Sequence, residues 1–145
     1  MFRQLATFGT RVTSSLLTKQ QPKFVPHYSN QVRLNSGFVF DVESLEDFNE
    51  KVINSPVPVI VDFHADWCAP CKTLGPRLEE KVNGRAGEVL LAKINVDYAG
   101  ELATDYGISA VPTVFGFKNG EQSIGFQGVI DDDQLEDFID TLVDQ

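Results

Sequence analysis

Residues 57–72 read Val-Pro-Val-Ile-Val-Asp-Phe-His-Ala-Asp-Trp-Cys-Ala-Pro-Cys-Lys, and this stretch decides the fold. The nearly continuous apolar run over 57–63 is rich in Val and Ile, which is typical of a strand buried on both faces of a parallel sheet. A helix is predicted to follow from about Cys68, because apolar side chains recur there at helical spacing. The positions that would share its inner face are Cys71, Leu74, Leu78 and Val82. The stretch therefore predicts the central strand of a sheet and the helix that follows it.

Strand-like and helix-like segments alternate on both sides of this stretch. Further strands are predicted at residues 37–42, 89–96, 113–117 and 122–126, and further helices at 44–54, 101–106 and from 131 onward. Asn119-Gly120, between the last two apolar runs, indicates a hairpin. The pattern predicts an α/β fold: a mostly parallel five-stranded sheet with an antiparallel C-terminal hairpin and helices on both faces.

The length of 145 residues suits one domain, and the charge is distributed unevenly along it. Residues 1–40 hold five basic residues and no acidic one, whereas residues 41–145 hold seven basic and 21 acidic residues, a net charge of −14. Nucleic-acid binding needs clustered Lys and Arg, so it is not expected of the acidic part. No stretch approaches the roughly 20 apolar residues that span a bilayer, so no membrane partner is expected either.

The first 36 residues have the composition of an organelle transit peptide. They combine Arg, Ser and Thr with an apolar stripe at helical spacing, and they lack the continuous apolar core of a secretory signal. We expect residues 1–36 to be a cleaved mitochondrial transit peptide and residues 37–145 to be the folded domain, acting in the mitochondrial matrix. Chloroplast import and a basic arm for acidic partners are the alternatives.

Both cysteines of the chain, Cys68 and Cys71, form a C-x-x-C pair. Structural zinc requires four ligands, and only His64 remains in the predicted domain, so no metal is expected. Haem attachment requires His after the second cysteine, where this chain has Lys72. A structural disulfide that closes so short a loop would add little stability. Dithiol–disulfide redox chemistry is the reading that these exclusions favour.

The helix that starts at the cysteines would activate the first of them. Cys68 would lie in the first turn, where free backbone N–H groups favour thiolate over thiol and lower the pKa of the side chain. Cys71, one turn later on the apolar face, is expected to be more buried and to stay protonated. Cys68 would then attack a substrate disulfide and Cys71 would resolve the mixed disulfide, which requires a proton acceptor.

Asp62 is the predicted proton acceptor, because it ends an apolar run that should be buried on both faces, and burial raises the pKa of a carboxyl. Lys93, in the next predicted strand, could pair with Asp62 across the sheet and moderate that rise. A solvated strand-end carboxylate and an exposed lysine are the alternative readings. Trp67 is either an exposed cover of the site or part of the core.

Three stretches now identify a resemblance: Val-Asp-Phe-His-Ala at 61–65, Leu-Gly-Pro-Arg-Leu-Glu at 74–79 and Ser-Ala-Val-Pro-Thr-Val at 109–114. Together with the Trp-Cys-x-Pro-Cys motif, they resemble the thioredoxin family, in particular the mitochondrial thioredoxins of animals. The resemblance covers nearly all of the chain from about Phe38 and implies the thioredoxin fold. It also implies that Asp62 is a buried base that assists Cys71, with Lys93 beside it.

The same resemblance implies a substrate surface and partners. Val111-Pro112 would be a cis peptide facing the disulfide, and the apolar docking surface would comprise Trp67, Pro70, Val111, Pro112 and Gly128. Electrons would come from an NADPH-dependent thioredoxin reductase, so the chain itself would need no cofactor. Peroxiredoxins are plausible recipients, and a monomer is expected.

Two positions depart from the family pattern. Ala69 stands where most thioredoxins have Gly and could change the redox potential, while the retained Pro70 favours a reductant over an oxidant. Gln127 precedes Gly128 where many thioredoxins have an apolar residue, which would make the docking surface more polar. The sequence thus predicts a protein-disulfide reductase. The alternatives are a dithiol oxidant or isomerase and a binding module with a redox latch.

Overall fold

The computed structural model describes residues 37–145, so the predicted transit peptide at 1–36 lies outside the described residues. The elements in chain order are β1 (Val39–Asp41), α1 (Leu45–Phe48), the π-helix η1 (Asn49–Ile53), β2 (Val59–His64), α2 (Ala69–Gly84), β3 (Leu90–Asn95), α3 (Gly100–Asp105), β4 (Thr113–Lys118), β5 (Glu121–Gln127) and α4 (Asp132–Asp144). Within this part of the chain, no helix is long and apolar enough to cross a membrane.

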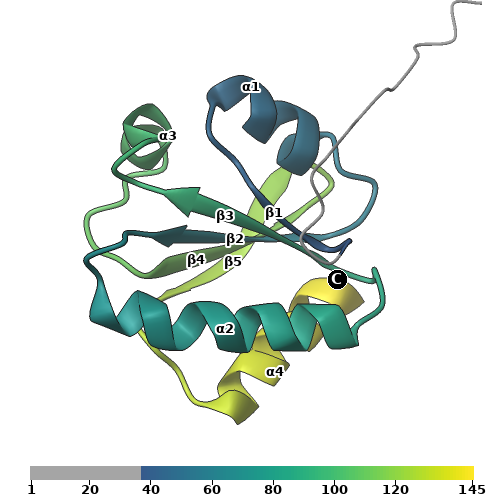
Figure 1. Ribbon diagram of the computed structural model, residues 1–145. Helices are drawn as coiled ribbons and strands as arrows, with labels where there is room; N and C mark the ends of the chain where they lie inside the picture. Colours follow the sequence, from purple (N-terminus) through teal and green to yellow (C-terminus); the bar gives the residue numbers. More distant parts are fainter. Residues whose placement is uncertain (1–36) are drawn as a thin grey trace, which may run out of the picture. The chain divides into compact units, whose positions relative to one another are not determined.

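The five strands form one sheet in the order β1-β3-β2-β4-β5, with β2 at its centre (Figure 1). Parallel pairing joins β1, β3 and β2, whereas β4 pairs antiparallel with both β2 and β5. The predicted five-stranded α/β architecture with its C-terminal hairpin is confirmed, and half of its strand pairings are antiparallel. In the parallel register Asp62 of β2 lies opposite Lys93 of β3, so the two side chains leave the same face of the sheet.

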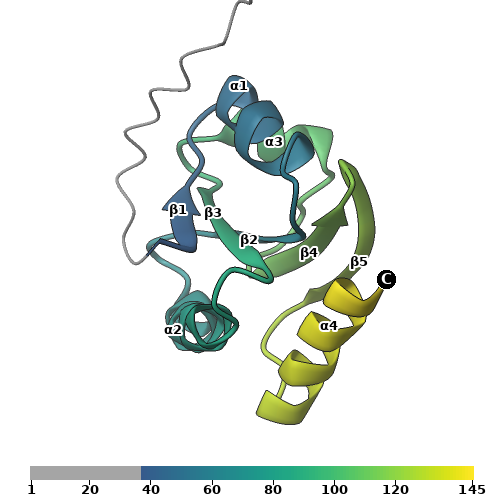
Figure 2. The same cartoon turned by 90° about the vertical axis from the view of Figure 1, so that its right-hand side faces the viewer.

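Helices cover both faces of the sheet: α2 and α4 lie on one face, and α1 and α3 on the other (Figures 1 and 2). Side chains of β2 alternate between the two layers, as the two-residue period of a strand requires. Ile60 packs with the α2 and α4 residues Leu74, Leu78, Leu135, Ile139 and Leu142. Phe63 packs in the opposite layer with Phe48, Val52, Leu102 and Phe117. Asp62 follows the parity of Ile60 and therefore faces the α2 layer.

Local sequence signals account for three of the element ends. The Ser44 side chain accepts a hydrogen bond from the Asp47 N–H at the start of α1. Asn119 and Gly120 both have positive φ, the geometry of the tight hairpin predicted between β4 and β5. Asp131 and Gln134 form a reciprocal capping box that begins α4. The helix predicted over 44–54 instead changes from α to π geometry at Asn49.

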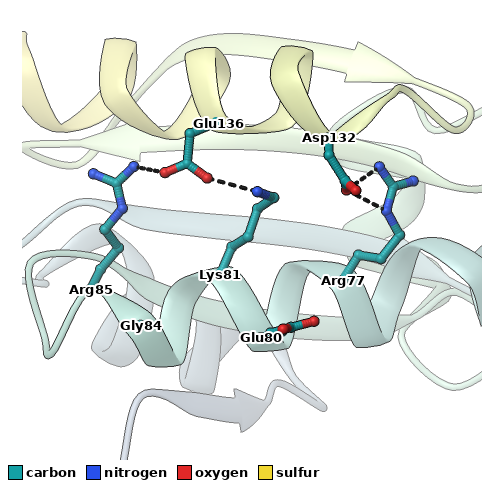
Figure 3. Close-up of a pocket in the computed structure, with 7 residues that line it drawn as sticks. All are labelled: Arg77, Glu80, Lys81, Gly84, Arg85, Asp132 and Glu136. Atoms are coloured by element: carbon teal, nitrogen blue, oxygen red, sulfur yellow. Dashed lines mark hydrogen bonds and ion pairs between the residues drawn. The ribbon is translucent and has the colours of Figure 1, made fainter.

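Ion pairs join α2 to α4 along their exposed sides (Figure 3). The Arg77 guanidinium donates two hydrogen bonds to Asp132, at 2.6 and 2.9 Å. Glu136 accepts from Lys81 at 2.7 Å and also from Arg85. Exposed pairs of this kind contribute little to stability individually, so the buried Leu and Ile side chains beneath them supply most of the attachment of α4.

Gly116 of β4 provides a test of how tightly α4 packs on the sheet. A Cβ at this position would lie 2.8 Å from Leu142 Cδ1 and 3.0 Å from Ile124 Cγ1, closer than packed carbons approach. Gly116→Ala is therefore expected to lower the free energy of unfolding by about 1 to 3 kcal/mol, measured by urea denaturation. Gly84→Ala, at an open helical position, is the control and should be neutral or slightly stabilising. Equal stability of the two variants would contradict the close packing.

Candidate active site

The two cysteines lie where the loop after β2 enters α2, and they are joined by a disulfide bond with a Cα–Cα distance of 5.3 Å. Cys68 is the N-cap of α2, and its Sγ accepts a hydrogen bond from the Cys71 backbone N–H at 3.2 Å. The predicted position of Cys68 at a helix N-terminus is confirmed. The same N–H and the helix dipole would stabilise a Cys68 thiolate once the disulfide is reduced.

Both cysteines are buried in the disulfide form: Cys68 is 3% exposed and Cys71 is 6% exposed. The prediction that Cys71 is the more buried of the two is therefore wrong for this form. Cys68 packs against Ala65 and the half-buried Val111, whose carbonyl oxygen lies 3.6 Å from Cys68 Sγ. A disulfide sulfur has no proton to donate, so this is a packing contact. Helical periodicity could not predict it, because Val111 comes from a distant loop.

The carboxyl group of Asp62 is buried and lines the same cavity as Cys71. Its residue is only 2% exposed, and its Oδ1 has no hydrogen-bond partner within the described structure. Burial raises the pKa of Asp62 to about 7, while the charge of Lys93 opposes this rise and that of Glu79 reinforces it. The predicted burial and the predicted raised pKa are both confirmed, so this carboxyl can exchange a proton near neutral pH.

Lys93 is half-buried beside Asp62, but its ammonium is bonded elsewhere. Lys93 Nζ donates to Glu79 Oε1 on α2 at 2.7 Å. Burial disfavours the charged ammonium, yet the Glu79 hydrogen bond and charge outweigh burial and raise the pKa of Lys93. The predicted moderating effect of Lys93 on Asp62 is confirmed. The bonded partner across the site is Glu79, which the sequence reasoning missed.

Asp62, Cys71, Glu79 and Lys93 line one cavity of about 430 Å³ on the α2 side of the sheet. The cavity links Cys71 and the buried carboxyl of Asp62 to the surface, which gives protons a route between them and solvent. Among residues 37–145, no group of three or more His, Cys, Asp or Glu side chains is arranged to hold a metal ion.

The residues predicted to form the substrate surface surround the disulfide. Trp67 is 70% exposed, and its Nε1 donates to Asp97 at 3.0 Å, so the reading of Trp67 as core is excluded. Val111-Pro112 is a cis peptide. The Gly128 N–H donates to the Pro112 carbonyl oxygen at 2.9 Å, which ties the loop after β5 to the proline loop. Pro112 itself is buried.

Ala69 and Pro70 occupy the first turn of α2 with exposed side chains. Proline is tolerated there because its missing N–H would have no partner within the helix. The extra methyl of Ala69 points to solvent beside the disulfide.

Sequence reasoning missed three residues near the site: Glu79, Asp97 and Val129. Glu79 follows Cys71 by eight residues, a helical spacing that places it on the same face of α2 and could have identified it. Asp97 holds the Trp67 indole across 30 positions of sequence, for which no local signal exists. Val129 is an exposed apolar residue next to Gly128, where it extends the apolar surface.

A cysteine pair at a helix N-terminus that shares a cavity with a buried carboxyl, on a five-stranded α/β sheet, defines a protein-disulfide oxidoreductase. Comparison with known proteins agrees, because residues 39–141 match the thioredoxin family. The chain belongs to the thioredoxin family, whose members carry out dithiol–disulfide exchange.

Individual relatives support this assignment. Probable thioredoxin-2 of Caenorhabditis elegans is 75% identical over 105 residues, which cover 72% of either chain. The mitochondrial thioredoxin of Mus musculus is 50% identical over 104 residues, which cover 72% of this chain and 63% of the mouse protein. The solved structure of Malassezia sympodialis thioredoxin is 33% identical with a TM-score of 0.66, covering 73% of this chain and 94% of that one.

The buried carboxyl makes the stability of the disulfide form depend on pH. Because the pKa of Asp62 is about 7 in the folded chain and 3.8 as a reference, the folded state binds the extra proton between about pH 4 and pH 7. Stability therefore falls as pH rises through this window, by about 4 kcal/mol in total. In Asp62→Asn this loss should be absent. The difference in free energy of unfolding between the variant and the parent chain should therefore shift in favour of the variant by that amount from about pH 4 to pH 7. Urea denaturation at each pH measures it, and parallel pH profiles would contradict a raised pKa.

Proposed function

We propose that this chain is a mitochondrial protein-disulfide reductase that a thioredoxin reductase returns to its dithiol form. One arrangement carries the proposal: the Cys68–Cys71 pair at the start of α2, with Cys71 lining the same cavity as the unpartnered carboxyl of Asp62. The family assignment supports it, since thioredoxins are generally reduced by thioredoxin reductase and act on disulfide proteins.

In the first step the Cys68 thiolate attacks one sulfur of a substrate disulfide. A bond forms between Cys68 Sγ and that sulfur, the substrate disulfide breaks, and the other substrate sulfur leaves as a thiolate. The Cys71 N–H that contacts Cys68 Sγ would stabilise the attacking thiolate without a neighbouring histidine base.

In the second step Cys71 resolves the mixed disulfide. Its thiol gives a proton to the Asp62 carboxylate, and the resulting thiolate attacks Cys68 Sγ. The Cys68–Cys71 bond forms as the substrate leaves as its second thiolate, so the substrate has gained two electrons and this chain has lost two. A carboxyl with a pKa of about 7 suits this transfer far better than an exposed carboxylate, because its basicity is closer to that of a thiol.

Substrate would dock on the apolar and backbone groups around the disulfide, formed by Trp67, Val111, Pro112 and Gly128. Trp67 is the exposed aromatic beside Cys68, and aromatic side chains of this kind dominate many protein interfaces. The Gly128–Pro112 hydrogen bond holds the two loops together. Disulfide proteins such as peroxiredoxins are the proposed recipients, and the chain itself is proposed to act as a monomer.

A mitochondrial location is supported by the basic, acid-free residues 1–36 and by the mitochondrial relatives at about 50% identity. Fractionation of cells should find the chain in the mitochondrial matrix, shortened by about the first 36 residues. Edman sequencing of the mitochondrial protein that finds Met1 in place would reject cleavage, and a cytosolic protein would reject import.

The central experiment follows NADPH consumption by the full chain with a thioredoxin reductase and insulin. Turnover is expected with the parent chain and should be abolished in Cys71→Ser, which keeps the attacking Cys68 but cannot resolve the mixed disulfide. Mass spectrometry of Cys71→Ser should show the trapped mixed disulfide. A folded parent chain without turnover, with reductases from several sources, would favour the redox-latch alternative. A reduction potential far above that of thioredoxins would favour the oxidant alternative.

Two further variants in the same assay separate the steps. Asp62→Asn should leave the first attack intact and slow resolution by about 100-fold, the scale of a lost general base. Trp67→Ala should raise KM for insulin with little change in kcat, because Trp67 would bind substrate without touching the proton path. Equal rates of attack and resolution in Asp62→Asn would remove Asp62 from the mechanism.

A further inference from the structure

The Lys93 ammonium has two candidate carboxyl partners, and the structure shows which one holds it. Lys93 Nζ is hydrogen-bonded to Glu79 Oε1 at 2.7 Å, whereas the buried Oδ1 of Asp62 has no partner. All three side chains line the same cavity. Leaving a buried carboxyl oxygen without a hydrogen-bond partner is unfavourable, and a nearby ammonium would normally bind to it. Another interaction must therefore hold the Lys93 ammonium away from Asp62.

Backbone geometry explains why the two carboxyl groups compete for the ammonium. Asp62 and Lys93 are register partners on the adjacent parallel strands β2 and β3, so their side chains leave the same face of the sheet. Glu79 lies on α2, which packs over that face, two helical turns beyond Cys71. Lys93 therefore projects between the sheet and the helix, with one carboxyl on either side.

The choice of partner decides what Asp62 can do. An ammonium bonded to Asp62 would stabilise the carboxylate, and a carboxylate so stabilised is a poor acceptor for the proton of a thiol. An ammonium bonded to Glu79 leaves Asp62 surrounded by apolar strand neighbours, where the protonated form is favoured. Glu79 also adds a negative charge on the same side of the sheet, which acts on Asp62 in the same direction.

We propose that Glu79 is a positioning residue for the resolving step: by holding the Lys93 ammonium, it keeps Asp62 unpaired and able to accept the proton of Cys71. This inference rests on the proposed function, because it assigns Glu79 a role in the step that Asp62 is proposed to assist. Glu79 touches neither sulfur and acts only through Lys93 and Asp62.

Other titratable groups face the same cavity and must be counted with these. They are His64 and Asp66 at the carboxyl end of β2, and Cys71 and Lys72 in the first turn of α2. Asp41, the register partner of Lys93 on β1, lines a different cavity, which it shares with Lys93. Burial, together with the charge of Lys93, lowers the pKa of half-buried His64. In the disulfide form Cys71 does not titrate, which leaves Asp62 as the buried acid of the cavity.

The first test is an NMR titration of the Asp62 carboxyl carbon in the disulfide form of the full chain. Glu79→Gln should move the titration midpoint of Asp62 toward acid by about 1 pH unit, because Lys93 is freed to pair with Asp62. The matched control is Glu80→Gln, which removes the same charge from an exposed neighbour on α2 (Figure 3). A midpoint in Glu79→Gln equal to that in Glu80→Gln would overturn the proposal.

A double-mutant cycle separates positioning from the direct effect of the Glu79 charge. Lys93→Gln alone should move the Asp62 midpoint toward alkaline pH, since a favourable charge is lost. In the Lys93→Gln background, Glu79→Gln should produce less than half of the shift that it produces in the parent chain. A shift of equal size in both backgrounds would show that Glu79 acts by its own charge and would overturn the positioning role.

The kinetic test uses the two successive thiol releases when the reduced chain reacts with an aromatic disulfide reagent in stopped flow. The second release reports resolution, and its pH profile should move toward acid in Glu79→Gln while remaining unchanged in Glu80→Gln. An unmoved profile would overturn the role of Glu79 in resolution. If Asp62→Asn leaves the second release unchanged, the proposed function of Asp62 fails, and the titration still decides separately whether Glu79 controls the Asp62 midpoint.

Discussion

The burial of one ionisable carboxyl in the central strand is the constraint on which the rest of the structure depends. Asp62 occupies a position in β2 where every neighbour from Val59 to Phe63 is buried. Removing a carboxylate from water is unfavourable, and here no hydrogen bond to its Oδ1 compensates. The surrounding fold must therefore be stable enough to hold Asp62 in place. The two apolar layers against the sheet supply that stability.

Helix α2 links the buried Asp62 carboxyl to the two cysteines. Its first turn carries the cysteines, and its second half anchors the helix to the rest of the fold. Its first turn presents Cys68 and Cys71 at the end of β2, where the helix dipole favours a thiolate. Its second half is fixed by Leu78 and Val82 in the core and by the ion pairs of Arg77, Lys81 and Arg85 with α4. Because α2 is held along its length, the two cysteines keep a fixed position relative to Asp62. Glu79 directly follows Arg77 and Leu78 in this second half, so the residue that pairs with Lys93 is a neighbour of residues that hold the helix in place.

Patterns within the sequence were sufficient for the fold and for the two cysteines, and insufficient for the contacts between elements. The apolar run at 57–63, the Asn119-Gly120 turn and the cap at Asp131 are local signals, and each element they predict is present. The burial of Cys68 depends on Val111, 43 residues away, and the partner of Lys93 depends on how α2 lies over the sheet. The π-helical turn at Asn49–Ile53 likewise has no local signal that we can identify. Side-chain partners across a packed layer are set by tertiary geometry, which periodicity does not encode.

Stability and chemistry oppose each other at this site, and the placement of Lys93 shows how the conflict is resolved. An ion pair between Lys93 and Asp62 would relieve the buried carboxyl and stabilise the fold, yet it would hold Asp62 as a weakly basic carboxylate. The structure instead pairs Lys93 with the half-buried Glu79, where a carboxylate is already well solvated and gains less from the pair. The fold thus forgoes the ion pair between Lys93 and Asp62 that its own strand register offers. Such an arrangement fits a carboxyl that exchanges protons near neutral pH, because full electrostatic compensation by an ammonium would lower the pKa of Asp62.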